Sequence, residues 1–101
     1  MIVKKTPEFM EWFYKESNKT RLQVISRLER ISSYSHFGDM KNLGGQLFEL
    51  RWRNGRRIYF TFDENNCLVL LGGNKNGQTK DIKEARRLQK RETSSDALGS
   101  D

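Results

Sequence analysis

Two stretches of alternating apolar and polar residues, separated by the segment Arg53-Asn54-Gly55, most constrain how this chain can fold. In the first stretch Phe48, Leu50 and Trp52 alternate with charged residues, and residues 57–62 alternate in the same way. Alternation with a period of two is typical of a strand with one buried face, and a short loop containing glycine joins antiparallel neighbours. The pattern therefore predicts a β-hairpin.

The segments around this hairpin predict a mixed α+β domain. A third apolar run, Cys67–Leu71, is apolar on both faces, as in a central strand, and residues 1–5 are expected to form a short first strand. Thr6-Pro7 predicts a helix start, because Thr is a good N-cap and Pro is favoured at the first helical position. A break near Ser17-Asn18 is expected to separate this helix from a second one.

The apolar periodicity predicts the second helix over residues 20–33, a loop over residues 34–46 and a last helix over residues 79–91. The predicted order is βααβββα, an antiparallel sheet packed on an N-terminal α-hairpin with a C-terminal helix. The sequence predicts one domain, residues 1–91, and a disordered tail, residues 92–101, which has little to bury.

The length of the hairpin loop decides which side chains share a face of the sheet. A two-residue Asn54-Gly55 turn would place charged and apolar residues on one face, which a half-buried strand pair does not tolerate. A three-residue loop, Arg53-Asn54-Gly55, instead places Leu50 opposite Ile58 on the core side. We therefore predict the three-residue loop, with Phe48 opposite Phe60.

On the other face, this register predicts that Arg51 lies opposite Arg57 and that Glu49 lies opposite Tyr59. Two arginines directly opposite each other repel, so an anionic ligand would explain them better than stability would. Continuing the meander places Arg57 beside Gly72 and brings Lys75 close, and we expect the small glycines to leave room for a ligand. The predicted site is a concave basic face of Arg51, Arg57 and Lys75, with Glu49 and Tyr59 at its edge.

The charge of the chain favours a polyanionic partner. Nineteen Lys and Arg against thirteen Asp and Glu give a formal net charge of +6, and such an excess is typical of nucleic-acid-binding proteins. A basic surface that serves solubility alone is the other explanation.

The composition also argues against several classes of site. A single Cys and a single His do not make an ordinary zinc site, and the sequence has no Gly-rich phosphate loop, so neither a metal nor a cofactor is expected. Cys67 lies in an apolar run and is expected to be a buried structural thiol. No signal peptide and no apolar stretch of the roughly 18–20 residues needed to span a bilayer are seen, so we expect a cytoplasmic protein with no membrane association.

Four segments of the chain resemble the phage-related addiction module killer toxins, a HigB-like branch of the RelE/ParE superfamily. The segments are Lys41–Gly45, Leu47–Arg51, Arg56–Phe60 and Leu70–Lys75. The resemblance covers roughly residues 1–90. It implies a toxin that is encoded beside a helix-turn-helix antitoxin protein and that acts on mRNA in the A site of the 70S ribosome, as a metal-independent endoribonuclease.

Carried over residue by residue, the resemblance implies that Arg51 contacts the mRNA backbone and that Arg57 stabilises the scissile phosphate. Lys75 is expected to lie near the same phosphate. Arg53, Arg56 and Lys80 are expected to contact RNA or the ribosome.

RNA cleavage also needs groups that remove the proton of the 2′-hydroxyl and protonate the 5′-oxygen. Glu49 or Tyr59 could supply the base, although Glu49 also fits a cross-strand ion pair. His36 is a further candidate, and Asp81 fits a first-turn residue that is favoured by the helix dipole. Relatives often carry tyrosine or histidine near the last helix, where this chain has Asp81-Ile82.

Two other functions fit the same sequence. A ParE-like protein of this fold would bind DNA gyrase and cut no RNA, and a non-catalytic module would bind RNA only. The basic residues are concentrated on the predicted sheet rather than on the helices, which favours RNA cleavage over gyrase binding.

Overall fold

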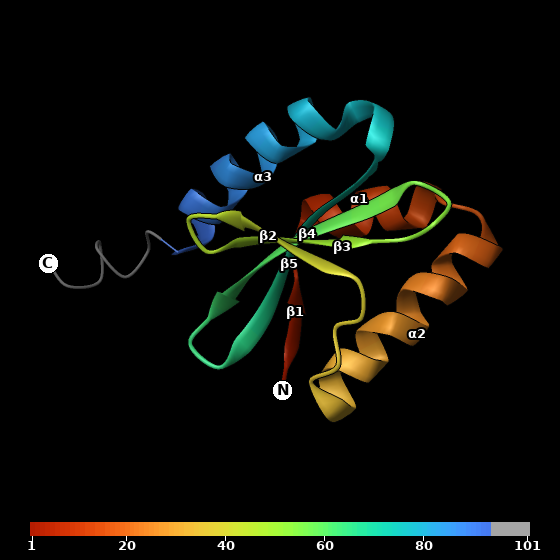
Figure 1. The fold of residues 1–101 in the computed structure, drawn as a ribbon, viewed down its shortest axis with the longest axis horizontal. Helices are drawn as coiled ribbons and strands as arrows, with labels where there is room; N and C mark the ends of the chain where they lie inside the picture. The colour runs from red at the N-terminus through yellow and green to blue at the C-terminus, as the bar shows by residue number, and fades with distance from the viewer. Residues whose placement is uncertain (94–101) are drawn as a thin grey trace, which may run out of the picture.

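The computed structural model describes residues 1–93, which form a five-stranded sheet with three α-helices (Figure 1). The elements are β1 (Val3–Lys5), α1 (Pro7–Lys15), α2 (Asn18–Tyr34), β2 (Met40–Gly44), β3 (Leu47–Arg51), β4 (Arg56–Asp63), β5 (Asn66–Asn74), the 3-10 turn η1 (Lys75–Gly77) and α3 (Gln78–Thr93). Helix α3 runs two residues past its predicted end, so residues 92 and 93 are helical. The rest of the predicted tail lies outside the described residues. Within residues 1–93 no helix is both long and apolar enough to cross a membrane.

The strand order of the sheet is β1-β5-β4-β3-β2. Strand β1 runs parallel to β5, and each of the other neighbours is antiparallel. The predicted α+β class and the meander of three strands, β3 to β5, are therefore confirmed. The sheet carries one strand more than predicted.

The additional strand is β2, which lies in the segment that was predicted to be a loop. It pairs with β3 so that Met40 faces Leu50 and Asn42 faces Phe48. Because β2 is the edge of the sheet and its residues are largely exposed, it lacks the alternation that identifies a half-buried strand. The prediction of a loop over residues 34–46 was wrong for this reason.

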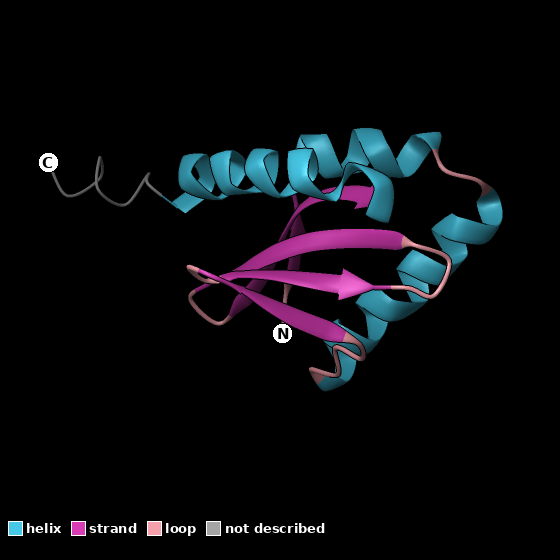
Figure 2. Cartoon of the chain, turned by 45° about the horizontal axis from the view of Figure 1, so that its top comes forward, coloured by secondary structure: helices cyan, strands magenta, loops and turns pink. Residues whose placement is uncertain are grey.

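Helices cover both faces of the sheet (Figures 1 and 2). Helices α1 and α2 pack on one face, where the buried residues are Phe9, Val24, Leu28, Ile31, Leu50, Ile58, Phe60, Cys67 and Val69. Helix α3 packs on the other face, where the buried residues are Leu47, Tyr59, Leu68, Leu70, Ala85 and Leu88. The face that carries Arg51 and Arg57 is therefore covered along part of its length.

Helix α1 begins where the sequence predicts. The hydroxyl of Thr6 accepts a hydrogen bond from the amide of Phe9 at 3.0 Å, and Pro7 occupies the first turn. The same hydroxyl donates to the carbonyl of Leu70 at 2.7 Å. This one side chain therefore caps α1 and fixes the start of the helix on β5.

An irregularity in β5 shifts the predicted neighbour of Arg57. Tyr59 pairs with Leu71 and Phe60 pairs with Val69, so Leu70 is an extra residue in the β5 strand. Beyond this bulge Arg57 faces Gly73 rather than Gly72. The predicted position beside Gly72 was therefore wrong by one residue.

Candidate active site

The hairpin of β3 and β4 has the predicted register. Arg51 pairs with Arg57, and Glu49 pairs with Tyr59. The amide of Gly55 donates to the carbonyl of Trp52 at 3.1 Å, which closes a tight loop. Gly55 has φ of 93°, a conformation that glycine adopts without strain. The loop therefore fixes both arginines on one face of the sheet.

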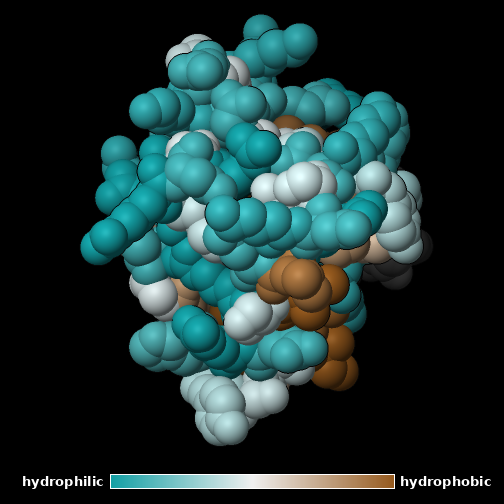
Figure 3. Space-filling view, turned by 90° about the vertical axis from the view of Figure 1, so that its right-hand side faces the viewer, coloured by the Kyte–Doolittle hydropathy of each residue, from teal (hydrophilic) through white to brown (hydrophobic). Residues whose placement is uncertain are grey.

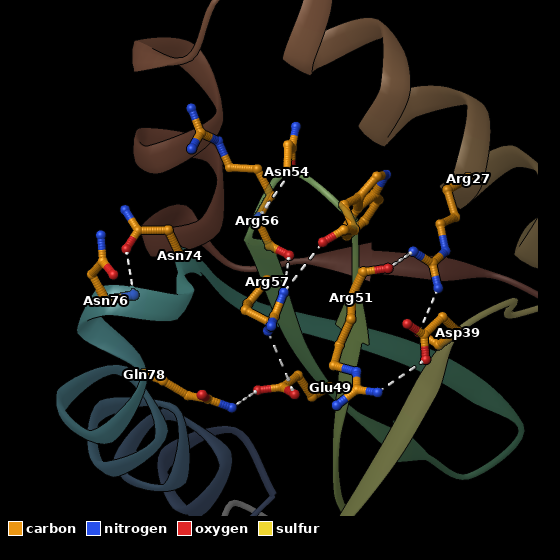
Figure 4. Close-up of polar contacts among 11 residues, drawn as sticks. Arg27, Asp39, Glu49, Arg51, Asn54, Arg56, Arg57, Asn74, Asn76 and Gln78 are labelled. Atoms are coloured by element: carbon orange, nitrogen blue, oxygen red, sulfur yellow. Dashed lines mark hydrogen bonds and ion pairs between the residues drawn. The ribbon is translucent and has the colours of Figure 1, made fainter.

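Arg57 is held close to the sheet (Figure 4), and only 15% of its side chain is exposed. Its Nη1 donates to the backbone carbonyls of Arg56 at 3.0 Å and Trp52 at 3.4 Å. Its Nε lies 3.8 Å from Oε1 of Glu49. The guanidinium is thus oriented by its own hairpin on one side and by a carboxylate on the other.

Arg51 is more accessible than Arg57. Its side chain is 39% exposed, and Nη2 lies 3.5 Å from Oδ1 of Asp39, which is itself exposed. An exposed ion pair of this length is weak, because water screens both charges. Arg51 can therefore exchange Asp39 for an anionic ligand.

Glu49 and Tyr59 were predicted at the edge of the basic face. In the structure α3 covers both residues, so they are not accessible there. Both residues are fully buried. Oε2 of Glu49 accepts a hydrogen bond from the side-chain amide of Gln78, in the first turn of α3, at 2.7 Å. The ion pair with Arg57 agrees with the alternative explanation of Glu49 as an ion-pair partner.

Burial also sets the proton chemistry of Tyr59. Loss of solvent raises the pKa of its phenol well above the ordinary value, and the negative charge of Glu49 raises the pKa further. A phenol with a raised pKa stays protonated at neutral pH. In this arrangement both side chains are closed off from solvent by α3.

The glycines of β5 do not leave an empty space above the sheet, which corrects another expectation. A Cβ atom on Gly72 would lie 2.2 Å from the ring of Trp12, and one on Gly73 would lie 2.1 Å from Oδ2 of Asp81. The absent side chains therefore make room for α1 and for the first turn of α3. Burial raises the pKa of the Asp81 carboxyl.

Gln78 was not predicted to lie at this site. Asp81 was predicted only as a first-turn residue favoured by the helix dipole. Gln78 fell just outside the predicted helix, which was placed from residue 79. Asp81 does lie in the first turn of α3, as predicted. A side chain that contacts a glycine of a neighbouring strand leaves no pattern in the sequence.

The remaining predicted basic residues lie at the hairpin end and on α3. The amide of Lys75 donates to the carbonyl of Gly55 at 2.8 Å, so Lys75 lies beside the hairpin loop, and its side chain is exposed. Arg56 is not a free docking residue, because its Nε lies 2.6 Å from Oε1 of Glu16 at the end of α1. Arg53 and Lys80 are exposed.

The candidate His36 and the thiol Cys67, which was predicted to be structural, take no part in these contacts. His36 is exposed and follows the C-terminal end of α2, where its amide donates to the carbonyl of Arg30. Cys67 is buried, and burial raises the pKa of its thiol to about 12. In residues 1–93 no group of three or more His, Cys, Asp and Glu side chains is arranged to hold a metal ion.

Solved structures with the same arrangement of elements include toxins of the RelE type. The E. coli RelBE toxin–antitoxin complex matches with a TM-score of 0.62 at 14% identity, covering 72% of this chain and 94% of the matched chain. The RelB–RelE antitoxin–toxin complex of Methanococcus jannaschii matches with a TM-score of 0.66 at 11% identity, covering 76% and 95%. A mutant form of E. coli RelE in the free state matches with a TM-score of 0.66 at 13% identity, covering 85% and 94%. These likenesses confirm the RelE fold.

Sequence comparison identifies relatives at greater similarity. An uncharacterized protein of Haemophilus influenzae is 36% identical over 91 residues, which cover 85% of this chain and 90% of that protein. The family model described as "Phage derived protein Gp49-like (DUF891)" matches residues 9–92. The chain therefore belongs to the phage-derived Gp49-like family and has the RelE fold, as the resemblance seen in its sequence implied.

Proposed function

We propose that this protein is the toxin of a type II toxin–antitoxin pair, of the HigB-like branch, and that it cuts mRNA on the 70S ribosome in the cytoplasm. The observation that carries the proposal is the Arg51–Arg57 pair, two cations directly opposite each other on one face of a RelE-type sheet. Like charges in this position cost stability. Binding a phosphodiester would turn that cost into affinity.

Arg57 is the residue that we assign to the scissile phosphate. A guanidinium grips two phosphate oxygens at once, and its charge stabilises the extra negative charge that develops during attack. The distance of 3.8 Å to Glu49 is that of an ion pair rather than a close hydrogen bond. A phosphate can therefore compete with Glu49 for Arg57, while the two backbone carbonyls keep the guanidinium oriented.

Arg51 and Lys75 complete the proposed phosphate site. Arg51 is half-exposed on the same face, and Lys75 is exposed beside the hairpin loop. Arg53 and Lys80, both exposed, are assigned to docking on RNA of the ribosome. No metal takes part in the proposed cleavage, since the cations of the chain supply the charge.

Glu49 acts in this proposal as a positioning residue. It is buried between Arg57 and Gln78, so it fixes the guanidinium and is itself fixed by α3. It becomes a general base only if the first turn of α3 moves away and lets the 2′-hydroxyl reach it. The burial of Tyr59 favours a role in packing.

The proposed partner that controls the toxin is a helix-turn-helix antitoxin protein. Support comes from the two matching structures in which a RelE protein is bound to its antitoxin RelB. Expression of the native operon with a tag on the toxin tests this point. Co-purification of a small helix-turn-helix protein is expected, and a toxin that emerges alone and fully active would contradict it.

The test of the proposed activity is cleavage of a defined mRNA in a purified translation system, mapped by primer extension. Wild-type protein is expected to cut only in the presence of ribosomes with an empty A site. Arg57→Ala is expected to lower the rate about 10²–10³-fold, the usual effect of removing one donor to a developing oxyanion. Uncut messages together with stalled DNA gyrase would contradict the proposal.

Matched variants separate chemistry from folding. Arg57→Ala leaves the buried carboxylate of Glu49 without its cation, so Arg57→Lys is tested beside it: it keeps the charge but loses the two-oxygen grip. Arg87→Ala removes one positive charge from the exposed face of α3, where Arg87 pairs with Glu84. Arg57→Lys is expected to be slow and Arg87→Ala to be close to wild type; equal rates for both would exclude Arg57 from the reaction.

A further inference from the structure

A groove lies between α2 and the hairpin, on the side of the sheet opposite to the Arg51–Arg57 pair. It has a volume of about 400 Å³ and is lined by Leu22, Gln23, Ser26, Arg27, Arg30 and Trp52. This side of the molecule, where α2 and the β3–β4 loop lie, is predominantly hydrophilic (Figure 3). A groove of this size accommodates a small ligand such as one nucleotide.

Two of the lining residues, Arg27 and Trp52, form a stacked pair of flat groups. The guanidinium of Arg27 lies over the ring of Trp52, with Cζ 4.4 Å from the ring centroid. Its nitrogens donate to the carbonyls of Phe37 at 2.9 Å, Asp39 at 2.6 Å and Arg51 at 2.5 Å, and the bonds to Asp39 and Arg51 are visible in Figure 4. Three backbone acceptors hold the guanidinium plane in one orientation before any ligand arrives.

The lining of the groove combines apolar surface, to which the exposed Leu22 belongs, with two positive charges. The six lining residues include two arginines and no carboxylate. Arg30 and Gln23 are exposed on α2, and Asn54 of the hairpin loop donates to the amide oxygen of Gln23 at 3.5 Å. The exposed Arg53 is the neighbour of Trp52 in the chain. The exposed charges of Arg30 and Arg53 therefore lie close to the Arg27–Trp52 pair.

We propose that this groove binds one unpaired nucleotide of a single-stranded RNA, with the base against the Arg27–Trp52 pair and a phosphate at Arg30. Bases stack on aromatic rings and on guanidinium planes, and amide side chains such as Gln23 hydrogen-bond to base edges. The proposal rests on the proposed RNA-directed function for its class of ligand. It adds a second contact to that function, on the other side of the hairpin from the phosphate site.

A purely structural role would explain only part of this arrangement. Packing of α2 on β3 needs Arg27 and Trp52, because Arg27 links three backbone segments. It does not need the exposed Arg30 or Gln23, which project from α2 at the groove. The test therefore uses variants of both kinds.

The experiment measures binding of a 2′-O-methyl hexauridine, which cannot be cleaved, to the full chain without ribosomes, by fluorescence anisotropy at several salt concentrations. Trp52→Phe keeps a smaller stacking ring, so it is expected to weaken binding severalfold, by less than the loss of a whole aromatic stacking partner. Arg30→Gln is expected to weaken binding and to lower the salt slope by about 0.7, the contribution of one phosphate contact on a single strand. Arg87→Gln, which removes the same charge from α3, is the control.

A second probe guards against a folding effect of Trp52→Phe. A 2′-O-methyl hexamer that is abasic at all six positions keeps the phosphates and lacks every stacking base, so wild type and Trp52→Phe should bind it equally. Gln23→Ala is expected to weaken only the intact hexamer. Equal weakening by Arg30→Gln and Arg87→Gln would mean a general charge effect and would overturn the proposal, as would wild-type affinity of Trp52→Phe.

The outcome is separable from that of the proposed nuclease. Groove variants that lose hexamer binding in a chain that never cuts mRNA would support this site and reject the nuclease. A chain that cuts mRNA while Trp52→Phe and Arg30→Gln bind the hexamer as the wild type does would retain the nuclease and reject this site.

Discussion

Glu49 and Arg57 form an ion pair in which the carboxylate is fully buried and the guanidinium is 15% exposed, with 3.8 Å between Oε1 and Nε. They are diagonal neighbours on the face that α3 covers. Gln78 holds the other carboxylate oxygen, so the proposed phosphate-binding arginine is connected through Glu49 to the first turn of a helix.

This connection predicts energetic coupling between the two charges. Removing either partner of a buried pair leaves the other charge buried without a counter-ion, whereas removing both charges does not. Glu49→Gln and Arg57→Gln should each destabilise the protein, and the double variant should recover a coupling free energy of about 1–3 kcal/mol in urea unfolding. The same cycle on the exposed pair Glu84 and Arg87 should give no resolvable coupling. Strict additivity at Glu49 and Arg57 would show that the pair contributes nothing.

The two glycines of β5 are predicted to differ in their tolerance of a methyl group. In Gly72→Ala the new methyl group would overlap the large ring of Trp12 on α1. This overpacking should lower the free energy of unfolding by about 1–3 kcal/mol. Gly73→Ala meets the end of the Asp81 side chain, which can rotate away, so its cost should be smaller. Thermal unfolding of both variants checks the order, and a less stable Gly73→Ala would reverse it.

The contact between α1 and α3 predicts a dependence of stability on acid pH. Arg91 hydrogen-bonds to both carboxylate oxygens of Glu8, at 2.6 and 2.9 Å, and these bonds lower the pKa of Glu8 from 4.5 to about 2. A lowered folded-state pKa stabilises the protein above pH 4.5, and this contribution is lost as the pH falls from 4.5 to 2.

The variant Glu8→Gln isolates this effect. Its melting temperature should lie below that of the wild type by a constant amount above about pH 5, since both pKa values of Glu8 are then exceeded. The difference should shrink through the window and vanish below about pH 2. A difference that does not change with pH would assign the stabilisation to packing rather than to the charge of Glu8.

The thiol of Cys67 is predicted to be inert in the folded protein. Burial raises its pKa to about 12, so at pH 8 almost no thiolate is present and no reagent reaches it. Iodoacetamide should label Cys67 only after unfolding in guanidinium. Rapid labelling of the native protein, judged by mass spectrometry, would show that β5 opens far more easily than a central strand should.

The register of the hairpin could be predicted because two independent signals agree. Period-two alternation fixes which residues face the core, and Gly55 fixes the loop length, so the opposition of Arg51 and Arg57 follows from residues close in sequence. The position of Arg57 beside β5 could not be predicted in the same way. Cys67–Leu71 is uniformly apolar, and a bulge at Leu70 changes no pattern in such a run.

The burial of Glu49 and Tyr59 depended on the placement of α3. The apolar residues on both faces of β5 indicate that both faces are covered, yet the sequence does not say which helix covers the arginine face. The interaction of Gln78 with Glu49 joins residues 29 positions apart and has no local signature. Contacts of this kind decide how accessible the candidate site is. The positions of its cations could therefore be predicted from the sequence, but the extent to which α3 covers the site could not.

The parallel pairing of β1 with β5 has a consequence for the synthesis of the protein. Val3 pairs with Cys67 and Lys5 with Val69, so the first strand has no place in the sheet until the fifth has been made. Contacts between residues so distant in sequence form late, because a long loop must close first. The β1 edge of the sheet therefore cannot be completed before β5 has been synthesised, and a nascent chain that stops short of β5 cannot assemble the fold that carries the arginine pair.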